Sequence, residues 1–147
     1  MSQTSKNQTM IFHFKPNILP GAFTFYFGPY DEDEIRAAYE AAGFEDLNRQ
    51  LYRPAPHLAG MASYPEPAAP VLWMERTPHS PVEIGTLVHE LSHIVLRYLD
   101  DVGMRHDDHT TEVFSYLMDA LTSAVLERVW HGNLRDGTYD IKQSKIE

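Results

Sequence analysis

Cysteine is absent from the 147 residues. The chain therefore has no disulfide framework and no thiolate ligand, so any metal ion must be held by histidine, aspartate or glutamate. Long apolar runs are also absent, because none approaches the roughly 18 residues that a membrane-spanning helix needs. The N-terminal stretch MSQTSKNQT is polar with no apolar segment behind it, so no secretory signal is expected. These absences predict a soluble, cytoplasmic chain.

Basic residues are few, with 12 Lys and Arg against 21 Asp and Glu and a net charge of -9. This charge repels phosphate backbones and acidic membranes, so neither nucleic acid nor membrane is an expected partner. The apolar share of 43% and the length are those of one globular domain. We expect a single domain over residues 10–135, between a disordered tail at 1–9 and a polar tail at 136–147.

The first half of the chain alternates apolar and polar residues in short runs separated by Pro and Gly. Such runs are typical of strands, and they predict strands at 10–14, 22–28, 58–64 and 70–76. The stretch DEDEIRAAYEAAG has an N-cap pattern, helical spacing of its apolar residues and a final glycine, which predict a helix over 31–43. A short second helix is possible at 44–52, before the prolines that follow it.

A long helix is predicted after the fourth strand. Ser80 is a suitable N-cap, and Glu83 three residues later completes a capping box. Apolar residues then recur every three or four positions over 84–99, and Gly103 supplies a stop. Gly85 inside this helix either leaves room for a substrate or a neighbouring strand, or is a tolerated helix glycine.

This helix contains the stretch TLVHELSHIVLR, in which His89 and His93 stand four residues apart. That spacing puts the two imidazoles about 40° apart around the helix and one turn along it, so both can bind one metal ion. Glu90 is rotated by about 100° and is better placed to act on a water at the metal than to bind it. The alternative is a pair of surface histidines on an amphipathic helix.

A last helix is predicted to begin at Asp107 or Asp108 and to end near Gly132. It carries Glu112, which eighteen residues separate from His93. This spacing fits two antiparallel helices joined by a loop, so Glu112 is the preferred third ligand. Its alternative role is an ordinary acidic residue favoured near a helix N-terminus by the helix dipole.

Other residues near Glu112 compete for roles in the site. His106 and His109 in the tract HDDH could replace Glu112 as metal ligands. Tyr116 lies one turn after Glu112, where its hydroxyl could stabilise the oxyanion formed during amide hydrolysis. The alternative for Tyr116 is an aromatic residue at the rim of the site with its hydroxyl in water.

The motif HELSH followed by TTEVFSYLMD resembles the gluzincin branch of the zincin metallopeptidases. The run is similar to small phage- or prophage-encoded metallopeptidases and, more distantly, to the ImmA/IrrE group. The resemblance implies a zincin-like fold, one zinc ion per chain bound by His89, His93 and Glu112, and Glu90 as catalytic base. It also implies that the strand before the motif helix, PVLWMER, forms the sheet edge along which a peptide substrate lies.

We therefore expect an α+β, zincin-like domain: a small N-terminal sheet with one helix, then the HExxH helix packed on a C-terminal helix that bears Glu112. The expected function is zinc-dependent peptide hydrolysis in the cytoplasm of a bacterial or phage-infected cell, with a peptide or protein as substrate. One alternative is a non-catalytic interaction or assembly protein stabilised by a closed four-ligand metal site. Another is a non-haem iron site using the same two histidines and carboxylate.

Overall fold

The computed structural model describes residues 9–16, 19–41, 58–105, 107 and 110–143. These residues form five strands and three helices, so the chain has the predicted α+β class. The elements in chain order are β1 (Met10–Phe14), β2 (Phe23–Phe27), α2 (Glu32–Ala41), β3 (Gly60–Glu66), β4 (Ala69–Met74), α3 (Pro81–Asp101), α4 (Thr111–His131) and β5 (Thr138–Gln143). The tail at 1–8 and the short helix at 44–52 lie outside the described residues.

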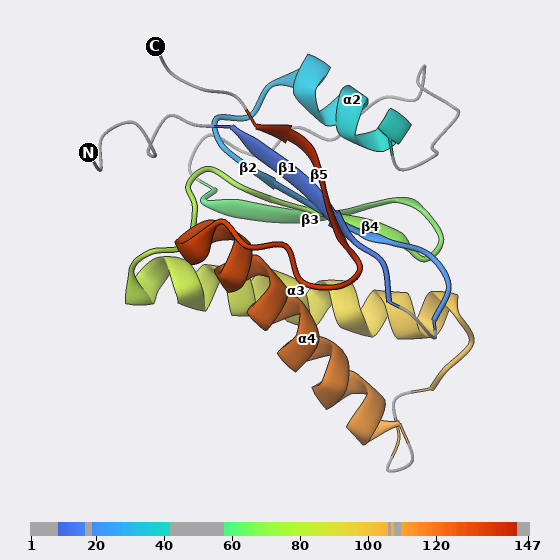
Figure 1. Ribbon diagram of the computed structural model, residues 1–147. Helices are drawn as coiled ribbons and strands as arrows, with labels where there is room; N and C mark the ends of the chain where they lie inside the picture. Colours follow the sequence, from blue (N-terminus) through green and yellow to red (C-terminus); the bar gives the residue numbers. More distant parts are fainter. Residues whose placement is uncertain (1–8, 17–18, 42–57, 106, 108–109, 144–147) are drawn as a thin grey trace.

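The strands form one mixed sheet in the order β3-β4-β2-β1-β5. The β2–β4 pair is parallel, and the β1–β2, β1–β5 and β3–β4 pairs are antiparallel. Figure 1 shows α2 over one face of this sheet and α3 and α4 across the other. The sheet is therefore the middle of three layers.

Both faces of the central strands are covered, which explains why every residue of β1 and β2 is buried. The alternation predicted from the sequence sorts their side chains onto two cores. Phe12, Phe25 and Leu72 face α3 and α4, whereas Ile11 and Tyr26 face α2. The sheet is thus fixed rigidly above α3, the helix that carries the HELSH motif.

The start of α3 is as predicted. Ser80 accepts a hydrogen bond from the backbone N–H of Glu83, and the Glu83 carboxylate accepts from the backbone N–H of Ser80, completing the capping box. The start of α4 differs from the expectation. Its N-cap is Thr110, whose backbone N–H donates to the Asp107 side chain. The Asp107 carboxylate therefore holds the turn before the helix instead of capping the helix itself.

The polar tail expected from residue 136 is in part a strand. Residues Thr138–Gln143 form β5, which pairs with β1 at the edge of the sheet. Arg128 of α4 donates two hydrogen bonds to the Asp140 carboxylate, at 2.8 and 3.0 Å, and so ties β5 to the helix layer. Residues Thr138–Gln143 are polar because they lie at an edge of the sheet. They form a strand because they pair with β1, which is distant in the sequence.

Among the helices of the described residues, none combines the length and the apolarity that crossing a membrane requires.

Candidate metal centre

The structure brings His89 and His93 together on the exposed side of α3. Their ring centroids lie 4.8 Å apart with the rings nearly perpendicular. The two Nε2 atoms are 3.3 Å apart, so both nitrogens approach one point in space. The core-facing residues of α3, such as Leu91 and Val95, are buried on another side of the helix, which leaves the imidazole pair accessible.

The histidine pair fits a zinc ion. Two nitrogens bound to one tetrahedral zinc at about 2.0–2.1 Å would be separated by about 3.3 Å. The Nε2 atoms of His89 and His93 already have that separation. Imidazole is a ligand that zinc accepts, and a catalytic zinc site needs a third protein ligand beside such a pair.

Glu90 points toward the sheet, at the side of α3 that faces β3. A Cβ atom added to Gly60, the first residue of β3, would lie 3.4 Å from the Cγ of Glu90. Among the described residues, Glu90 makes no hydrogen bond or ion pair, and its side chain is half-buried. A carboxylate in this position can exchange a proton with a ligand bound beside the start of β3.

Tyr64 of β3 lies against the same helix, because the guanidinium of Arg97 is 4.8 Å from the centroid of its ring. Burial raises the pKa of the Tyr64 hydroxyl, the Arg97 cation opposes that rise, and the charges of Glu90 and Asp101 reinforce it. The strand β3 and one row of α3 side chains thus share an electrostatic environment. We call the surface that Gly60, Tyr64, Glu90 and Arg97 form where β3 meets α3 the β3–α3 surface.

The described residues contain no group of three or more His, Asp or Glu side chains that could hold a metal ion. Glu112 lies in the first turn of α4 with an exposed side chain, so the structure does not group it with His89 and His93. His106 and His109 lie outside the described residues. The structure therefore brings together two of the three predicted ligands.

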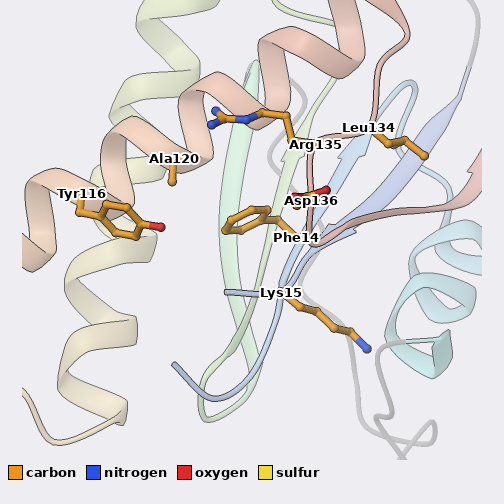
Figure 2. A pocket seen from close by; sticks show the side chains of 7 residues that line it. All are labelled: Phe14, Lys15, Tyr116, Ala120, Leu134, Arg135 and Asp136. Carbon is orange, nitrogen blue, oxygen red and sulfur yellow. The ribbon is translucent and has the colours of Figure 1, made fainter. Parts of the chain in front are cut away.

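Tyr116 lies elsewhere. It lines a cavity of about 440 Å³ with Phe14 and Lys15 at the end of β1, Ala120 of α4, and residues 134–136 after that helix. Figure 2 shows its hydroxyl directed into this cavity, toward Phe14. None of the histidine pair or Glu90 lines the cavity, so the structure does not place Tyr116 beside His89 and His93.

Next to α3 the outermost strand of the described sheet is β3, and this corrects the expectation that PVLWMER forms the edge. Its strand β4 lies inside the sheet, between β3 and β2. The backbone N–H of Glu75 donates to Ala59, which makes that pair a hydrogen-bonded one. Because such pairs alternate along an antiparallel ladder, Gly60 and Ala62 direct their N–H and C=O groups away from β4.

Arg97 is a residue of the site that the sequence analysis missed. Its guanidinium lies 4.8 Å from the ring centroid of Tyr64, and its Nε donates to Asp101 at 3.1 Å. It stands four residues after His93, at the spacing that already related His89 to His93. That repeated spacing was the available signal, but an arginine on an exposed helix face has no local mark of function.

Comparisons with protein-family models, with curated proteins and with solved structures found no match to this chain. The case for a function therefore rests on the geometry of its own residues.

Proposed function

We propose that this protein is a zinc-dependent peptide hydrolase in which His89 and His93 bind the metal and Glu90 is the general base. The observation that carries the proposal is the 3.3 Å separation of the two Nε2 atoms, which suits a tetrahedral zinc. When bound, zinc supplies a Lewis acid that acidifies water and polarises a carbonyl. Further support comes from the Glu90 carboxylate beside the pair, which has no hydrogen bond within the described residues and lies on the side where β3 ends the described sheet.

Glu90 would take a proton from the attacking water and pass it to the amine nitrogen that leaves when the peptide bond breaks. Its position against Gly60 keeps it at the start of β3. A carboxylate without a protein hydrogen bond does not have to break one before it accepts the proton. Glu90 is therefore assigned to proton transfer and the two imidazoles to metal binding.

An extended peptide would bind along β3 by adding a strand to the sheet. The outward N–H and C=O groups of Gly60 and Ala62 are available for main-chain hydrogen bonds. Such hydrogen bonds recognise any peptide backbone, which is the chemistry that a peptidase needs. Pro65 later in the strand has no N–H, so pairing along β3 would be limited to its first part.

Glu112 is the proposed third ligand. Because the described residues do not group it with the histidines, its ligation requires the first turn of α4 to approach α3 when the metal binds. That turn follows the connection after α3 and is exposed to solvent.

The cytoplasmic setting in a bacterial or phage-infected cell likewise stays a prediction.

The experiment that tests the proposal is elemental mass spectrometry of natively purified protein. We expect one zinc per chain, lost in His93→Ala and kept in His131→Ala, which removes an exposed histidine of α4. No zinc after metal is supplied would refute the metal site. One zinc with no cleavage of a diverse peptide library would instead favour the non-catalytic, metal-stabilised module.

A further inference from the structure

Arg97 is held in place on the β3–α3 surface by two contacts of different kinds. The ring of Tyr64 lies under its guanidinium at 4.8 Å, and the Asp101 carboxylate accepts from its Nε at 3.1 Å. A cation–π contact fixes the plane of the guanidinium, and a hydrogen bond to Nε fixes its rotation in that plane. Arg97 is thus oriented before any ligand arrives.

Asp101 is itself anchored. Its other carboxylate oxygen accepts from the backbone N–H of Ala68, in the turn between β3 and β4, at 3.2 Å. The Asp101 side chain is 12% exposed, whereas that of Arg97 is 51% exposed. The Arg97–Asp101 pair therefore has a mostly buried carboxylate anchored to the turn between β3 and β4, and a guanidinium that is accessible on the β3–α3 surface.

The accessible end is the pair of terminal amino groups of Arg97. Within the described residues, the hydrogen bond of Arg97 uses Nε, and no hydrogen bond occupies the terminal nitrogens. Two parallel N–H groups of a planar guanidinium match the two oxygens of a carboxylate. A lysine amine at this position would supply charge without that match.

Arg97 lies at a defined distance from the candidate base. Arg97 comes seven positions after Glu90, which is about 10 Å along α3, or about three residues of an extended peptide. The strand runs alongside in the same direction, because Gly60 meets Glu90 and Tyr64 meets Arg97. A peptide on β3 with its scissile bond at Glu90 would therefore bring a residue about three positions away to Arg97.

We propose that Arg97 binds a carboxylate of the bound peptide, either an acidic side chain or the C-terminal carboxylate, and so selects the substrate. This inference rests on the proposed peptide hydrolysis and adds the substrate class to it. The chain has a net charge of -9, so acidic peptides are repelled in general. The oriented guanidinium of Arg97 on the β3–α3 surface would then favour peptides that carry a carboxylate at one position over peptides that are merely acidic.

The test measures binding, so that it does not depend on turnover. Full-length Glu90→Gln protein supplied with zinc is titrated into labelled hexapeptides of alternating Thr and Val, by fluorescence anisotropy. One Glu or Gln is placed at each position in turn, and each peptide is made with a C-terminal acid and with an amide. We expect one carboxylate position to tighten binding by about three- to tenfold, the range for a partly exposed charged hydrogen bond.

Matched variants assign this preference to Arg97. Arg97→Gln should remove the preference while changing affinity for the neutral peptide by less than about twofold. Arg97→Lys should restore part of it, because the charge returns without the planar fork. Arg105→Gln, at an exposed arginine after α3, should leave the preference intact. Tighter binding of the peptide with a C-terminal acid than of the peptide with a C-terminal amide would show that Arg97 binds the terminal carboxylate.

Equal affinity for the Glu and Gln peptides, a preference that survives Arg97→Gln, or no binding of any peptide would overturn the inference. Cleavage by the wild-type protein is measured in parallel on the same peptides. Cleavage without a carboxylate preference defeats only the role of Arg97. A preference that disappears in Arg97→Gln, with no cleavage by the wild type, supports carboxylate recognition and defeats the peptidase proposal.

Discussion

The α-carbon of Gly60 in β3 faces the side chain of Glu90 in α3 so closely that a methyl group on Gly60 would lie 3.4 Å from the Glu90 Cγ. The same methyl would lie 3.1 Å from the Cγ2 of Thr86 and 3.2 Å from the carbonyl oxygen of Trp73. The edge strand and the turn of helix that bears the candidate base are therefore in direct contact. A change in one must move the other.

Gly60→Val should destabilise the fold and impair the site together. The branched side chain must displace Thr86 and Glu90 or the backbone of β4, and overpacking of this kind costs about 1–3 kcal/mol. We expect a lower Tm and a loss of peptide hydrolysis larger than the unfolded fraction explains, because Glu90 is pushed from its position. Activity should be measured well below the Tm of the variant. Unchanged activity there would show that Glu90 does not need this contact.

Gly85→Ala is the matched control on α3. Among the described residues, a Cβ atom on Gly85 meets nothing within 4 Å, so none of the described strands explains this glycine. Alanine in a helix interior should stabilise the protein by about 0.5–1 kcal/mol relative to glycine. Thermal unfolding measures this gain. If hydrolysis falls in Gly85→Ala although the fold is stabilised, the open space at Gly85 serves the substrate.

Glu90→Gln should keep zinc and lose catalysis. The amide preserves the shape of the side chain against Gly60 but cannot accept the proton of the attacking water. Removal of a general base lowers the rate by about 10²–10⁴. Elemental analysis and peptide-cleavage rates on the same sample give both quantities, with Glu75→Gln, an exposed glutamate beyond β4, as control. Full activity of Glu90→Gln would exclude the proposed mechanism.

Those parts of the fold that depend on local signals could be predicted from the sequence. The capping box at Ser80 and Glu83 defines the start of α3 because it needs contacts only within one turn. The alternation of apolar and polar residues predicted strands at 10–14 and 22–28, and the structure confirms β1 and β2, although it buries both faces of each. Spacing of four residues on one helix likewise predicted the meeting of His89 and His93, since helix geometry determines it.

Features that depend on distant partners could not be predicted in this way. The order of β5 comes from its pairing with β1 and from Arg128, neither of which is visible in its own polar sequence. Whether β3 or β4 forms the edge depends on the strand order of the whole sheet. Arg97 becomes notable only when the fold puts Tyr64 beneath it. The direction of Tyr116 depends on how α4 crosses the sheet.

Glu83→Gln should destabilise α3 in a pH-dependent manner. Burial pushes the pKa of the Glu83 carboxyl upward, but hydrogen bonds from the backbone of His79 and from Ser80, with the Arg76 charge, outweigh it and lower the pKa. A lowered folded-state pKa contributes stability that is present above the unfolded value of about 4.3 and is lost as pH falls through the folded value. The glutamine variant should cost about 0.5–1 kcal/mol at pH 7.

Urea unfolding of wild type and Glu83→Gln from pH 7 to pH 3 checks this expectation. The difference in unfolding free energy between the two proteins should shrink below about pH 4.5, where the unfolded carboxylate begins to protonate. Glu75→Gln, at an exposed position with no capping role, should show no such trend. A constant difference across this range would mean that the charge of Glu83 contributes nothing to the cap.

Asp140→Asn should loosen β5. Arg128 is 5% exposed, and its two hydrogen bonds to the Asp140 carboxylate compensate part of the cost of burying its charge. The amide of asparagine accepts one of those bonds and carries no charge, so we expect a loss of about 1–3 kcal/mol. Amide hydrogen exchange should accelerate in Thr138–Gln143 more than in β2. Equal exchange in both strands would show that β1 pairing alone holds β5.

Glu112→Ala decides whether α4 supplies the third ligand. Asp119 is the matched control, because it lies seven positions after Glu112 on the same helix. Seven positions bring its side chain to within about 20° of the direction of Glu112, and both side chains are exposed. If Glu112 binds the metal, its loss should weaken zinc affinity by at least about tenfold, whereas Asp119→Ala should leave the affinity unchanged. Competition with a chromophoric chelator gives both affinities. Equal affinities in the two variants would exclude Glu112, and the third ligand would then be sought at His106 and His109.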